Sequence, residues 1–593
     1  MKKEQPKVKR TAFLALLIFL LLCGLQWFSL ELSATTLFAI KARPVFQSLI
    51  SVSVVLFLNA AMLLMLGSFF AAQLCTSLFF TLLAVANTYV FQLHGSPLRL
   101  SELRSAFTAA NVIEGYQLSF PLPVRYILLI FLLETALLML VKRSNLQLGP
   151  SVRFTGFLLG CLSLGVILYG FRSPEWRPQV GWSMQTAINT YGYTTVLIED
   201  SLKFYSRYDT PDAYSEAAMD VISAKWESKS DPDSLPDERP DIVLILNETF
   251  YDPNVCKSLR VETDRPYLSR FYELENVARG FNAVPLSGTN GTEYELLTSN
   301  SSALINPSAP FNFFPLENAN SIIRYLASLG YETWAFHNAE PENYSRITAY
   351  PAMGFDHVAF YQHFMPETYY GKRRATDSHD YEKLIEAYEA AGDAPRFIYM
   401  LTIQNHGGWE QNPEELDTVH VSGDYGDLTD DYNEFLTSIS LSDSALQELV
   451  DYFSTVDRHV IVVMTGDHPP AFLTGAKSRL SDQKEIVLAN MTPYIIWSNY
   501  QNLTTEHPYI TCSDLVPLTL KTAGLPLSPY YKQVLDLQAK LPVHVSGFYF
   551  DTDGTLYTSA DGLSGESELN DYLLMECNNL QNPSKRRQKL FEP

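Results

Sequence analysis

Long stretches without charge dominate the first part of the chain and predict membrane-spanning helices. No Asp, Glu, Lys or Arg occurs at residues 11–30, or again at residues 44–98. A helix needs roughly 20 apolar residues to cross a bilayer, so the first stretch predicts one span and the second predicts two, with a tight turn near Gly67. Residues 126–141 and 154–171 predict a fourth and a fifth span.

Basic residues indicate which ends of these spans face the cytoplasm, because Lys and Arg accumulate in cytoplasmic segments. The N-terminal residues and the connection between the fourth and fifth spans are both basic, so both are predicted to be cytoplasmic. An odd number of spans then places everything after residue 171 outside the cell. A secretory signal peptide is the alternative for residues 11–30, although further apolar segments follow it. The basic residues in question are Lys2, Lys3, Lys7, Lys9, Arg10, Lys142, Arg143 and Arg153.

The remaining chain has the pattern of an α/β domain. Short apolar runs rich in β-branched and aromatic residues alternate with segments of helical period such as 436–453. The predicted strands are 242–246, 331–336, 397–403, 460–464 and 494–497. We therefore expect an α-helical membrane domain and an extracellular α/β domain with a mostly parallel central sheet flanked by helices. The expected boundaries are 1–172 for five transmembrane helices, 173–240 for juxtamembrane helices and a polar linker, 241–545 for the outer domain and 546–593 for a C-terminal tail.

Charge and cysteine content exclude some classes of protein. The net charge is −22, and most acidic residues lie beyond residue 172. Binding to nucleic acid needs a basic surface, so no nucleic-acid partner is expected. The six cysteines show no C-x-x-C spacing, which argues against a zinc-thiolate site.

Residues that could bind a metal ion follow several of the predicted strands. In open α/β sheets, sites form beyond the carboxyl ends of the strands. Such positions are occupied by Glu248, His337, His406 and the pair Asp467 and His468. Carboxylate oxygens with one imidazole nitrogen suit Mn²⁺ or Mg²⁺, and also Zn²⁺. The sequence thus predicts a site for one divalent cation at Glu248, Asp467 and His468.

A candidate nucleophile lies in the glycine-rich segment 286–298. Gly288 permits a close approach of the backbone, and the spacing of Thr292 and Glu295 predicts a helix start through a capping box. Thr289 would then lie beside a helix N-terminus, which favours an anionic phosphate oxygen. An ordinary glycine-rich loop with a helix cap remains the alternative on spacing alone.

Together these motifs resemble those of the lipoteichoic acid synthase-like phosphoglycerol transferases, a family of the alkaline phosphatase/sulfatase superfamily. The resemblance covers most of the chain, including the five spans, the linker and the outer domain. It rests on residues 247–250 (Asn-Glu-Thr-Phe), 288–294 (Gly-Thr-Asn-Gly-Thr-Glu-Tyr), 336–346, 405–407 (Asn-His-Gly), 466–468 (Gly-Asp-His) and 520–531.

The resemblance implies a role for each matched residue. Thr289 is the implied nucleophile. The implied ligands of one divalent ion, expected to be Mn²⁺ with Mg²⁺ or Zn²⁺ as alternatives, are Glu248, Thr289, Asp467 and His468. The implied substrate-binding residues are His337, Tyr344, Arg346 and His406, and both histidines are expected to donate hydrogen bonds to phosphate oxygens. Tyr344 occupies a position where the lipoteichoic acid synthases tend to have tryptophan.

The implied activity is transfer of a phosphoglycerol group from phosphatidylglycerol to an acceptor hydroxyl, through a covalent phospho-threonine intermediate. The expected partners are the lipid bilayer, the phosphatidylglycerol donor and a glycolipid or polyglycerolphosphate acceptor, as in lipoteichoic acid synthesis. The expected location is the cell membrane of a Gram-positive-type bacterium, with the catalytic domain outside. A phosphoethanolamine transferase, a phospholipid phosphodiesterase and a catalytically silent membrane sensor or scaffold remain alternatives.

Overall fold

The computed structural model forms two compact units. The first contains the long apolar helices and the second contains the large sheet, and among the described residues the chain passes from the first to the second between Leu202 and Lys203. The described residues are 5–94, 97–98, 120–143, 150–173, 175–178, 184–206, 210–228, 235–236, 238–285, 288–305, 310–313, 316, 319–341, 343–364, 369–370, 374–408, 416–545, 547–581 and 584–592. Part of the expected linker, residues 229–234 and 237, therefore lies outside the described residues.

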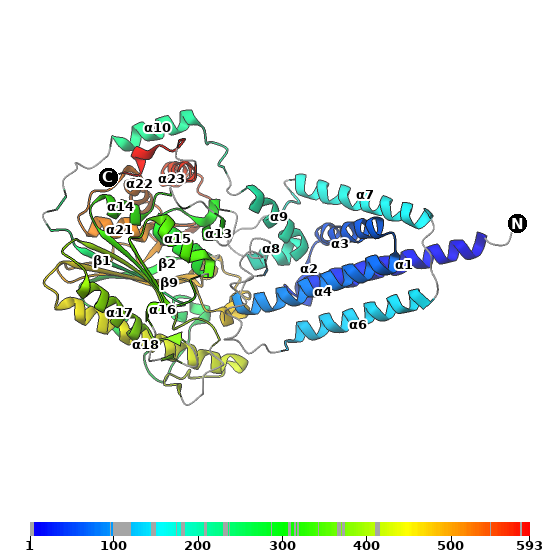
Figure 1. Ribbon diagram of the computed structural model, residues 1–593, viewed down its shortest axis with the longest axis horizontal. Helices are drawn as coiled ribbons and strands as arrows, with labels where there is room; N and C mark the ends of the chain where they lie inside the picture. Colours follow the sequence, from blue (N-terminus) through cyan, green and yellow to red (C-terminus); the bar gives the residue numbers. More distant parts are fainter. Residues whose placement is uncertain are drawn as a thin grey trace. The chain divides into compact units, whose positions relative to one another are not determined.

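Five helices of the first unit are long and apolar enough to cross a membrane (Figure 1). They are α1 (Gln5–Leu32), α3 (Val45–Leu66), α4 (Phe69–His94), α6 (Leu122–Arg143) and α7 (Pro150–Arg172). The turn between α3 and α4 lies at Gly67, whose φ of 63° is in the left-handed region that glycine adopts without strain. The five predicted membrane helices and the turn at Gly67 are confirmed.

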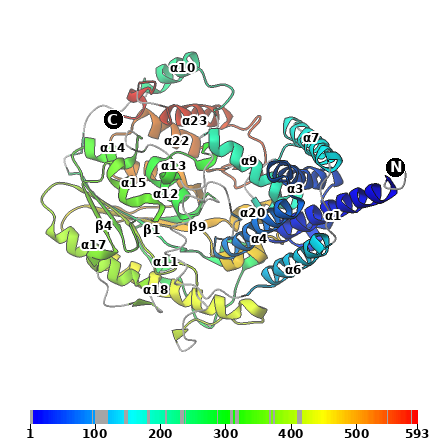
Figure 2. The same cartoon turned by 45° about the vertical axis from the view of Figure 1, so that its right-hand side comes forward.

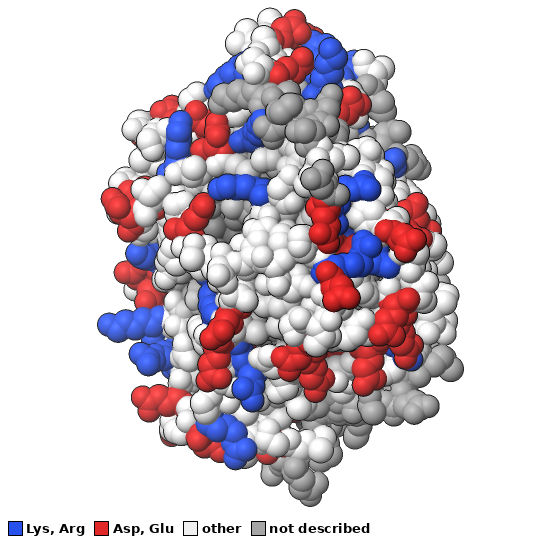
Figure 3. Space-filling model, turned by 90° about the vertical axis from the view of Figure 1, so that its left-hand side faces the viewer, with Lys and Arg blue, Asp and Glu red and all other residues white. Residues whose placement is uncertain are grey.

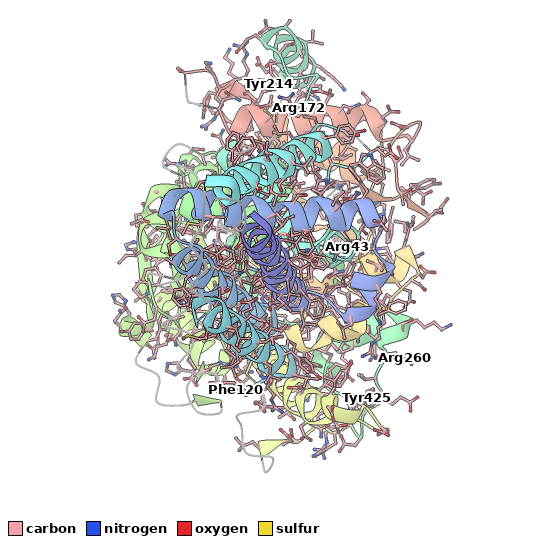
Figure 4. The ribbon with its side chains drawn as sticks, turned by 90° about the vertical axis from the view of Figure 1, so that its right-hand side faces the viewer. Arg43, Phe120, Arg172, Tyr214, Arg260 and Tyr425 are labelled. Carbon is pink, nitrogen blue, oxygen red and sulfur yellow. The ribbon has the colours of Figure 1, made fainter. Side chains whose placement is uncertain are left out.

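A buried polar junction holds the shorter helices of this unit to the long ones. Glu31, near the end of α1, lies 2.9 Å from Arg43, and both side chains are fully buried. Arg43, labelled in Figure 4, also donates to the carbonyl oxygen of Ile188 at 3.0 Å, and the backbone N–H of Tyr193 donates to Glu31 at 3.1 Å. The shorter helices are α2 (Leu37–Ala42), α8 (Met184–Tyr191) and α9 (Tyr193–Ser206).

The second unit is built on an eight-stranded sheet with the order β10-β2-β9-β8-β1-β7-β3-β4. The strands from β8 to β4 in this order are parallel to their neighbours, whereas β9 is antiparallel to both β8 and β2. All five predicted strands are present, and the predicted mostly parallel sheet is confirmed. The strands are β1 (Asp241–Asn247), β2 (Val277–Ala283), β3 (Glu332–His337), β4 (His357–Phe360), β7 (Arg396–Leu401), β8 (Val460–Gly466), β9 (Met491–Ser498) and β10 (Tyr509–Thr511).

Helices cover both faces of this sheet (Figures 1 and 2). Alternate residues of β1 consequently belong to different cores: Leu244 and Leu246 pack on one face, and Val243 and Ile245 on the other. The helices on the first face include α12 (Thr289–Thr298), α14 (Ile322–Ser328), α15 (Arg346–Met353), α21 (Leu515–Thr522) and α22 (Pro529–Gln538). Those on the second face are α11 (Ser269–Glu273), α17 (Asp377–Ala390) and α18 (Thr429–Ser454).

The last part of the chain folds onto the second unit. Arg587 forms ion pairs with Glu216 and Asp220 of α10 (Glu216–Glu227) at 2.8 and 2.7 Å. The C-terminal elements are β11 (Val543–Val545), β12 (Phe548–Phe550), β13 (Leu556–Tyr557) and α23 (Glu566–Asn579). The remaining short elements are α13 (Pro310–Phe313), α16 (Tyr361–Phe364), β5 (Tyr369–Tyr370), β6 (Arg374–Ala375), α19 (Thr474–Lys477) and α20 (Gln483–Leu488). Acidic and basic side chains are interspersed over the described residues of the face in Figure 3.

Candidate functional site

Adjacent parallel strands bring three of the predicted metal ligands together. Strands β1 and β8 pair in parallel with Asn247 opposite Gly466, so the residues that follow both strands leave the sheet side by side. His468 Nε2 lies 3.5 Å from Glu248 Oε1 and 3.4 Å from Asp467 Oδ2. One ligand atom from each of these side chains lies within 4.8 Å of the others.

Thr249 fixes the two carboxylates relative to each other. Its backbone N–H donates to Asp467 Oδ1 at 2.6 Å, and its hydroxyl donates to Glu248 Oε1 at 2.9 Å. Its φ of 50° lies in the left-handed region, which is strained for a β-branched residue by about 1–3 kcal/mol. The surrounding sheet holds this strained turn, and the turn aims both carboxylates at one point.

The orientation of the His468 ring suits a metal ligand. Nδ1 lies 3.0 Å from the carbonyl oxygen of Pro469. A carbonyl can only accept, so Nδ1 carries the proton and Nε2 presents its lone pair toward Glu248 and Asp467. A hydrogen bond from the non-coordinating nitrogen to a carbonyl is the usual way in which a metal-binding histidine is oriented.

The electrostatics of this cluster favour a bound cation. Burial raises the pKa of Glu248 to about 8, and the neighbouring Asp467 carboxylate adds to the rise. Burial alone would lower the pKa of His468, but Asp467 and Glu248 outweigh it and raise that pKa. Asp467 Oδ2 is fully buried and accepts no hydrogen bond from the described residues. Two buried carboxylates and one imidazole lone pair therefore fit a divalent cation.

Gly466 is required where the end of β8 passes close to the turn after β1. A Cβ atom on Gly466 would lie 2.0 Å from the carbonyl oxygen of Phe250. Real Cβ contacts are never that short, and the obstacle is backbone, which cannot rotate away. The glycine before Asp467 is therefore needed to bring β8 close to the strained turn after β1.

The predicted nucleophile lies at the start of a helix that contacts the cluster. Helix α12 begins at Thr289, and Gly288 with a φ of 71° is its N-cap. The Thr292 hydroxyl donates to the Asp467 carbonyl oxygen at 2.7 Å, and a Cβ on Gly288 would lie 3.9 Å from His468 Cδ2. The helix N-terminus that carries Thr289 is thus packed against residues of the candidate cation site.

One prediction about this segment is wrong. The expected capping box at Thr292 and Glu295 is absent, because the helix starts one turn earlier, at Thr289. Thr292 instead binds the Asp467 carbonyl, and Glu295 accepts from the N–H and the hydroxyl of Ser302 at 2.7 and 2.8 Å. The spacing resembles a capping box, but both side chains make hydrogen bonds to residues outside the helix instead of capping it.

His337 ends β3, is buried and is neutral. Nδ1 lies 3.0 Å from the carbonyl oxygen of Leu401, so Nδ1 carries the proton, and Nε2 lies 3.5 Å from Arg346 Nη1. Burial lowers the pKa of His337 to about 3, and the Arg346 charge adds to this effect. The expected hydrogen bond from His337 to phosphate is therefore not available from Nε2, which acts as an acceptor.

Arg346 is held in place by an acidic residue of α12. Its Nη2 lies 3.0 Å from Glu293 Oε2, and both side chains are buried. Tyr350 also donates to Glu293 at 2.5 Å. The guanidinium lies 5.1 Å from the ring centre of Tyr344, whose φ of 52° is left-handed. Helix α12 therefore connects the cation site at its N-terminus with the His337–Arg346 pair one turn later.

Two of these neighbours were missed in the sequence. Glu293 follows Thr289 by four residues, which places both on one face of a helix, and that spacing was a usable signal. Arg374 of β6 donates to the carbonyl oxygen of Gly407, next to His406, and its charge opposes the rise in the pKa of Glu248. No local pattern in the sequence marks Arg374.

Comparison with known proteins agrees with this architecture. Residues 240–525 match the family described as Sulfatase, so the second unit contains a sulfatase-family domain. The putative cyclic beta-1,2-glucan modification protein of Rhizobium meliloti (strain 1021) is 26% identical over 305 residues, which is 49% of this chain and 47% of that protein. Capsular polysaccharide biosynthesis protein RkpI of the same organism is 24% identical over 242 residues, or 40% of this chain and 42% of that protein. The chain thus spans about half the length of the curated relatives it matches.

A solved structure shares the fold of this unit. The Streptococcus pyogenes phosphoglycerol transferase GacH, in complex with sn-glycerol-1-phosphate, aligns with a TM-score of 0.53 at 19% identity, over 65% of this chain and 99% of that chain. The comparisons therefore agree on one class: a membrane protein with five candidate spans, whose larger unit contains a sulfatase-family domain over residues 240–525.

Proposed function

We propose that the chain is a membrane-anchored transferase that moves a phosphoglycerol group from phosphatidylglycerol to an acceptor hydroxyl through Thr289. The observation that carries this proposal is the position of Thr289. It is the first residue of α12, and that end of the helix contacts Asp467 and lies beside His468. A hydroxyl, a helix N-terminus and a cation site converge there, as phosphoryl transfer to a side chain requires.

Glu248, Asp467 and His468 would hold the divalent cation, with Thr289 as a further ligand, and Mn²⁺ is the expected ion. A bound cation would lower the pKa of the Thr289 hydroxyl and offset the negative charge of phosphate. The N-terminus of α12, which begins at Thr289, would also stabilise an anion beside that residue.

The first step forms one bond to phosphorus and breaks another. Thr289 loses its hydroxyl proton, and its oxygen attacks the phosphorus of phosphatidylglycerol. The bond from phosphorus to the diacylglycerol oxygen breaks, and that oxygen takes up a proton to leave as diacylglycerol. In the second step an acceptor hydroxyl loses its proton and attacks the phosphoglycerol-threonine, and Thr289 regains its hydroxyl.

Arg346, His337, Tyr344 and His406 would bind the transferred group. Arg346 is a fixed, buried guanidinium, and its planar fork suits phosphate oxygens. His337 is neutral with Nε2 as an acceptor, so it would receive a hydrogen bond from a hydroxyl of the glycerol.

The relatives suggest which donor and acceptor to test first. The structure of GacH, described as a phosphoglycerol transferase, holds sn-glycerol-1-phosphate. The name of one curated relative refers to a cyclic beta-1,2-glucan. A glucan hydroxyl is therefore worth testing as an acceptor next to the glycolipid and polyglycerolphosphate acceptors that the sequence motifs imply. We propose that the catalytic unit lies outside the cell membrane, where such acceptors occur.

The test uses the full-length protein in liposomes with Mn²⁺ and phosphatidylglycerol that carries a fluorescent acyl chain. We expect release of labelled diacylglycerol by the wild type and none by Thr289→Ala. The matched control is Thr298→Ala at the other end of α12, where the hydroxyl donates to the Tyr294 carbonyl oxygen. Release from phosphatidylethanolamine in a parallel vesicle set, with none from phosphatidylglycerol, would overturn the proposed donor and keep Thr289 as the nucleophile.

A further inference from the structure

A compact polar network lies behind the candidate site, at the carboxyl ends of β1 and β7. Its side chains come from both strand ends and from α17 and α18 on the second face of the sheet. Each is at most 1% exposed. The members are Asn247, Asp377, Gln404, Asn405, Ser438 and Ser442.

Asp377 is the acceptor at the centre of this network. Its Oδ2 receives hydrogen bonds from Asn247 Nδ2 at 2.7 Å and from the Ser442 hydroxyl at 2.6 Å. Its backbone N–H donates to Gln404 Oε1 at 2.9 Å. Burial raises the pKa of Asp377 above its usual range, and the hydrogen bonds from Ser442 and Asn247 oppose this rise.

Asp377 determines the orientation of both asparagine amides. Because Asn247 gives its N–H to Asp377, its Oδ1 faces Asn405 and accepts from Asn405 Nδ2 at 2.9 Å. The Ser442 oxygen accepts from Asn405 Nδ2 at 2.8 Å, so its own proton goes to Asp377. The remaining oxygen of Asn405 accepts from Ser438 at 2.5 Å. Because the Asp377 carboxylate can only accept, each hydrogen bond along this chain of side chains has one direction.

The two asparagines directly precede two candidate site residues. Asn247 comes before Glu248 of the cation site, and Asn405 comes before His406 of the substrate-binding set. The strand ends also bond to each other, since Thr402 Oγ1 accepts from the Glu248 backbone N–H at 3.2 Å. A shift of Asn247 therefore moves Glu248, and a shift of Asn405 moves His406.

We propose that Asp377 is a positioning residue that sets the placement of Glu248 relative to His406, and thereby couples the cation site to the phosphate-binding side. The proposal rests on the proposed function for the roles of Glu248 and His406. It assigns no contact between Asp377 and substrate. Removal of the Asp377 carboxylate releases both asparagines, so both loops lose their fixed geometry together.

Asp377→Ala is the informative variant, because it removes the oxygen that accepts from both Asn247 and Ser442. An asparagine could keep both hydrogen bonds through its single amide oxygen. Asp443→Ala is the matched control. Asp443 is also a buried aspartate, it follows Ser442 on α18, and it accepts the backbone N–H groups of Arg270 and Phe271 at 2.8 and 2.7 Å. Those partners belong to α11, which carries none of the predicted site residues.

The experiment measures Mn²⁺ affinity and amide hydrogen exchange of the full-length protein in nanodiscs. For Asp377→Ala we expect an affinity about tenfold weaker, the usual effect of losing a residue that supports a metal ligand. We also expect faster exchange in both loops, at residues 247–250 and 402–408. For Asp443→Ala we expect wild-type affinity, with faster exchange at residues 268–273. If Asp377→Ala does not fold, Ser442→Ala is measured instead, with changes expected in the same direction.

Other outcomes separate this proposal from the proposed function. Wild-type Mn²⁺ affinity in Asp377→Ala, or faster exchange in only one of the two loops, overturns the positioning role. Equal effects of Asp377→Ala and Asp443→Ala on affinity also overturn it, since they would reflect general loosening. If the wild type binds Mn²⁺ and releases no diacylglycerol, the proposed function fails and the positioning role stands. If the wild type binds no Mn²⁺, the exchange pattern alone decides.

Discussion

Glu293 Oε2 and Arg346 Nη2 lie 3.0 Å apart, with side chains that are 0% and 2% exposed. The first belongs to the helix that begins with Thr289, and the second to the helix after β3. This ion pair holds α12, which begins with the candidate nucleophile, against the arginine that would bind phosphate. It also means that Arg346 brings little net charge to the site, so a cation at Glu248, Asp467 and His468 is needed to balance a phosphodiester.

Glu293→Gln is expected to destabilise the second unit and to weaken substrate binding. Removing one partner of a buried ion pair costs about 3–5 kcal/mol, because the other charge stays buried without compensation. Thermal unfolding of the full chain measures the loss, and the KM for the lipid donor measures the effect on Arg346. The double variant Glu293→Gln, Arg346→Met should be more stable than Glu293→Gln alone; equal stability would show that the pair contributes little.

Thr249→Val tests how the two carboxylates are aligned. Valine keeps the branched shape but cannot donate to Glu248, so the cation site loses one fixed hydrogen bond. We expect Mn²⁺ affinity to fall about tenfold, as for other groups that support metal ligands. Thr249→Ser retains the hydroxyl and should bind Mn²⁺ nearly as the wild type does. Equal affinity of the valine and serine variants would rule out this role for the hydroxyl.

Metal affinity should rise with pH up to about 8. Burial and the Asp467 charge raise the pKa of Glu248 to about 8 in the metal-free protein. Below that pH a proton must leave before a cation binds, so the apparent affinity should increase up to tenfold per pH unit and then level off. Titration with Mn²⁺ between about pH 6 and pH 9 checks this. An affinity independent of pH would contradict the raised pKa.

His337 should remain neutral throughout the physiological range. Burial and Arg346 lower its pKa from 6.5 to about 3. A histidine whose folded pKa is lowered contributes stability above pH 6.5, and this contribution is lost as pH falls toward 3. His337→Asn should therefore show a weaker acid destabilisation than the wild type, and the acid limb of kcat/KM should keep its position. A shifted acid limb would assign a titration to His337.

Arg43→Met is expected to destabilise the membrane unit. Arg43 and Glu31 are both fully buried at 2.9 Å, so the variant leaves a buried carboxylate without its cation, at a cost of about 3–5 kcal/mol. Arg172→Met is the matched control, because Arg172 is an exposed arginine at the end of α7 (Figure 4). Thermal unfolding of the full chain in detergent should separate the two variants. An equal melting temperature for both would argue against the buried pair.

Much of the architecture could be predicted because it depends on local pattern. Uncharged runs of span length predict membrane helices whatever surrounds them, and buried parallel strands need apolar residues at every position, as in β1 and β8. The residue types that follow those strands were readable for the same reason, since the carboxyl ends of parallel strands share one edge of the sheet. Glu248, Asp467 and His468 could therefore be grouped before their distances were known, and their role as metal ligands stays a prediction.

The capping box at Thr292 shows where local pattern is insufficient. The same spacing forms a capping box only if the helix starts at Thr292. The helix starts at Thr289 instead, and Thr292 and Glu295 bond to Asp467 and Ser302. Thr292 binds a residue 175 positions away, and Glu295 binds Ser302, seven positions later and beyond the end of the helix.

The sequence by itself determined the five membrane helices, the mostly parallel sheet and the kinds of residue at its carboxyl edge, because each follows from hydrophobic period and composition over a few consecutive residues. Only the tertiary structure decided the neutral form of His337, the pairing of Arg346 with Glu293, the place of Arg374 beside Gly407 and the position of Asp377 beneath two loops. These features depend on burial and on partners that are distant in the sequence. Glu293 and Arg346 are 53 residues apart, and Asn247 and Asp377 are 130 residues apart. Protonation and hydrogen-bond direction are properties of that environment, and no window of the sequence contains it.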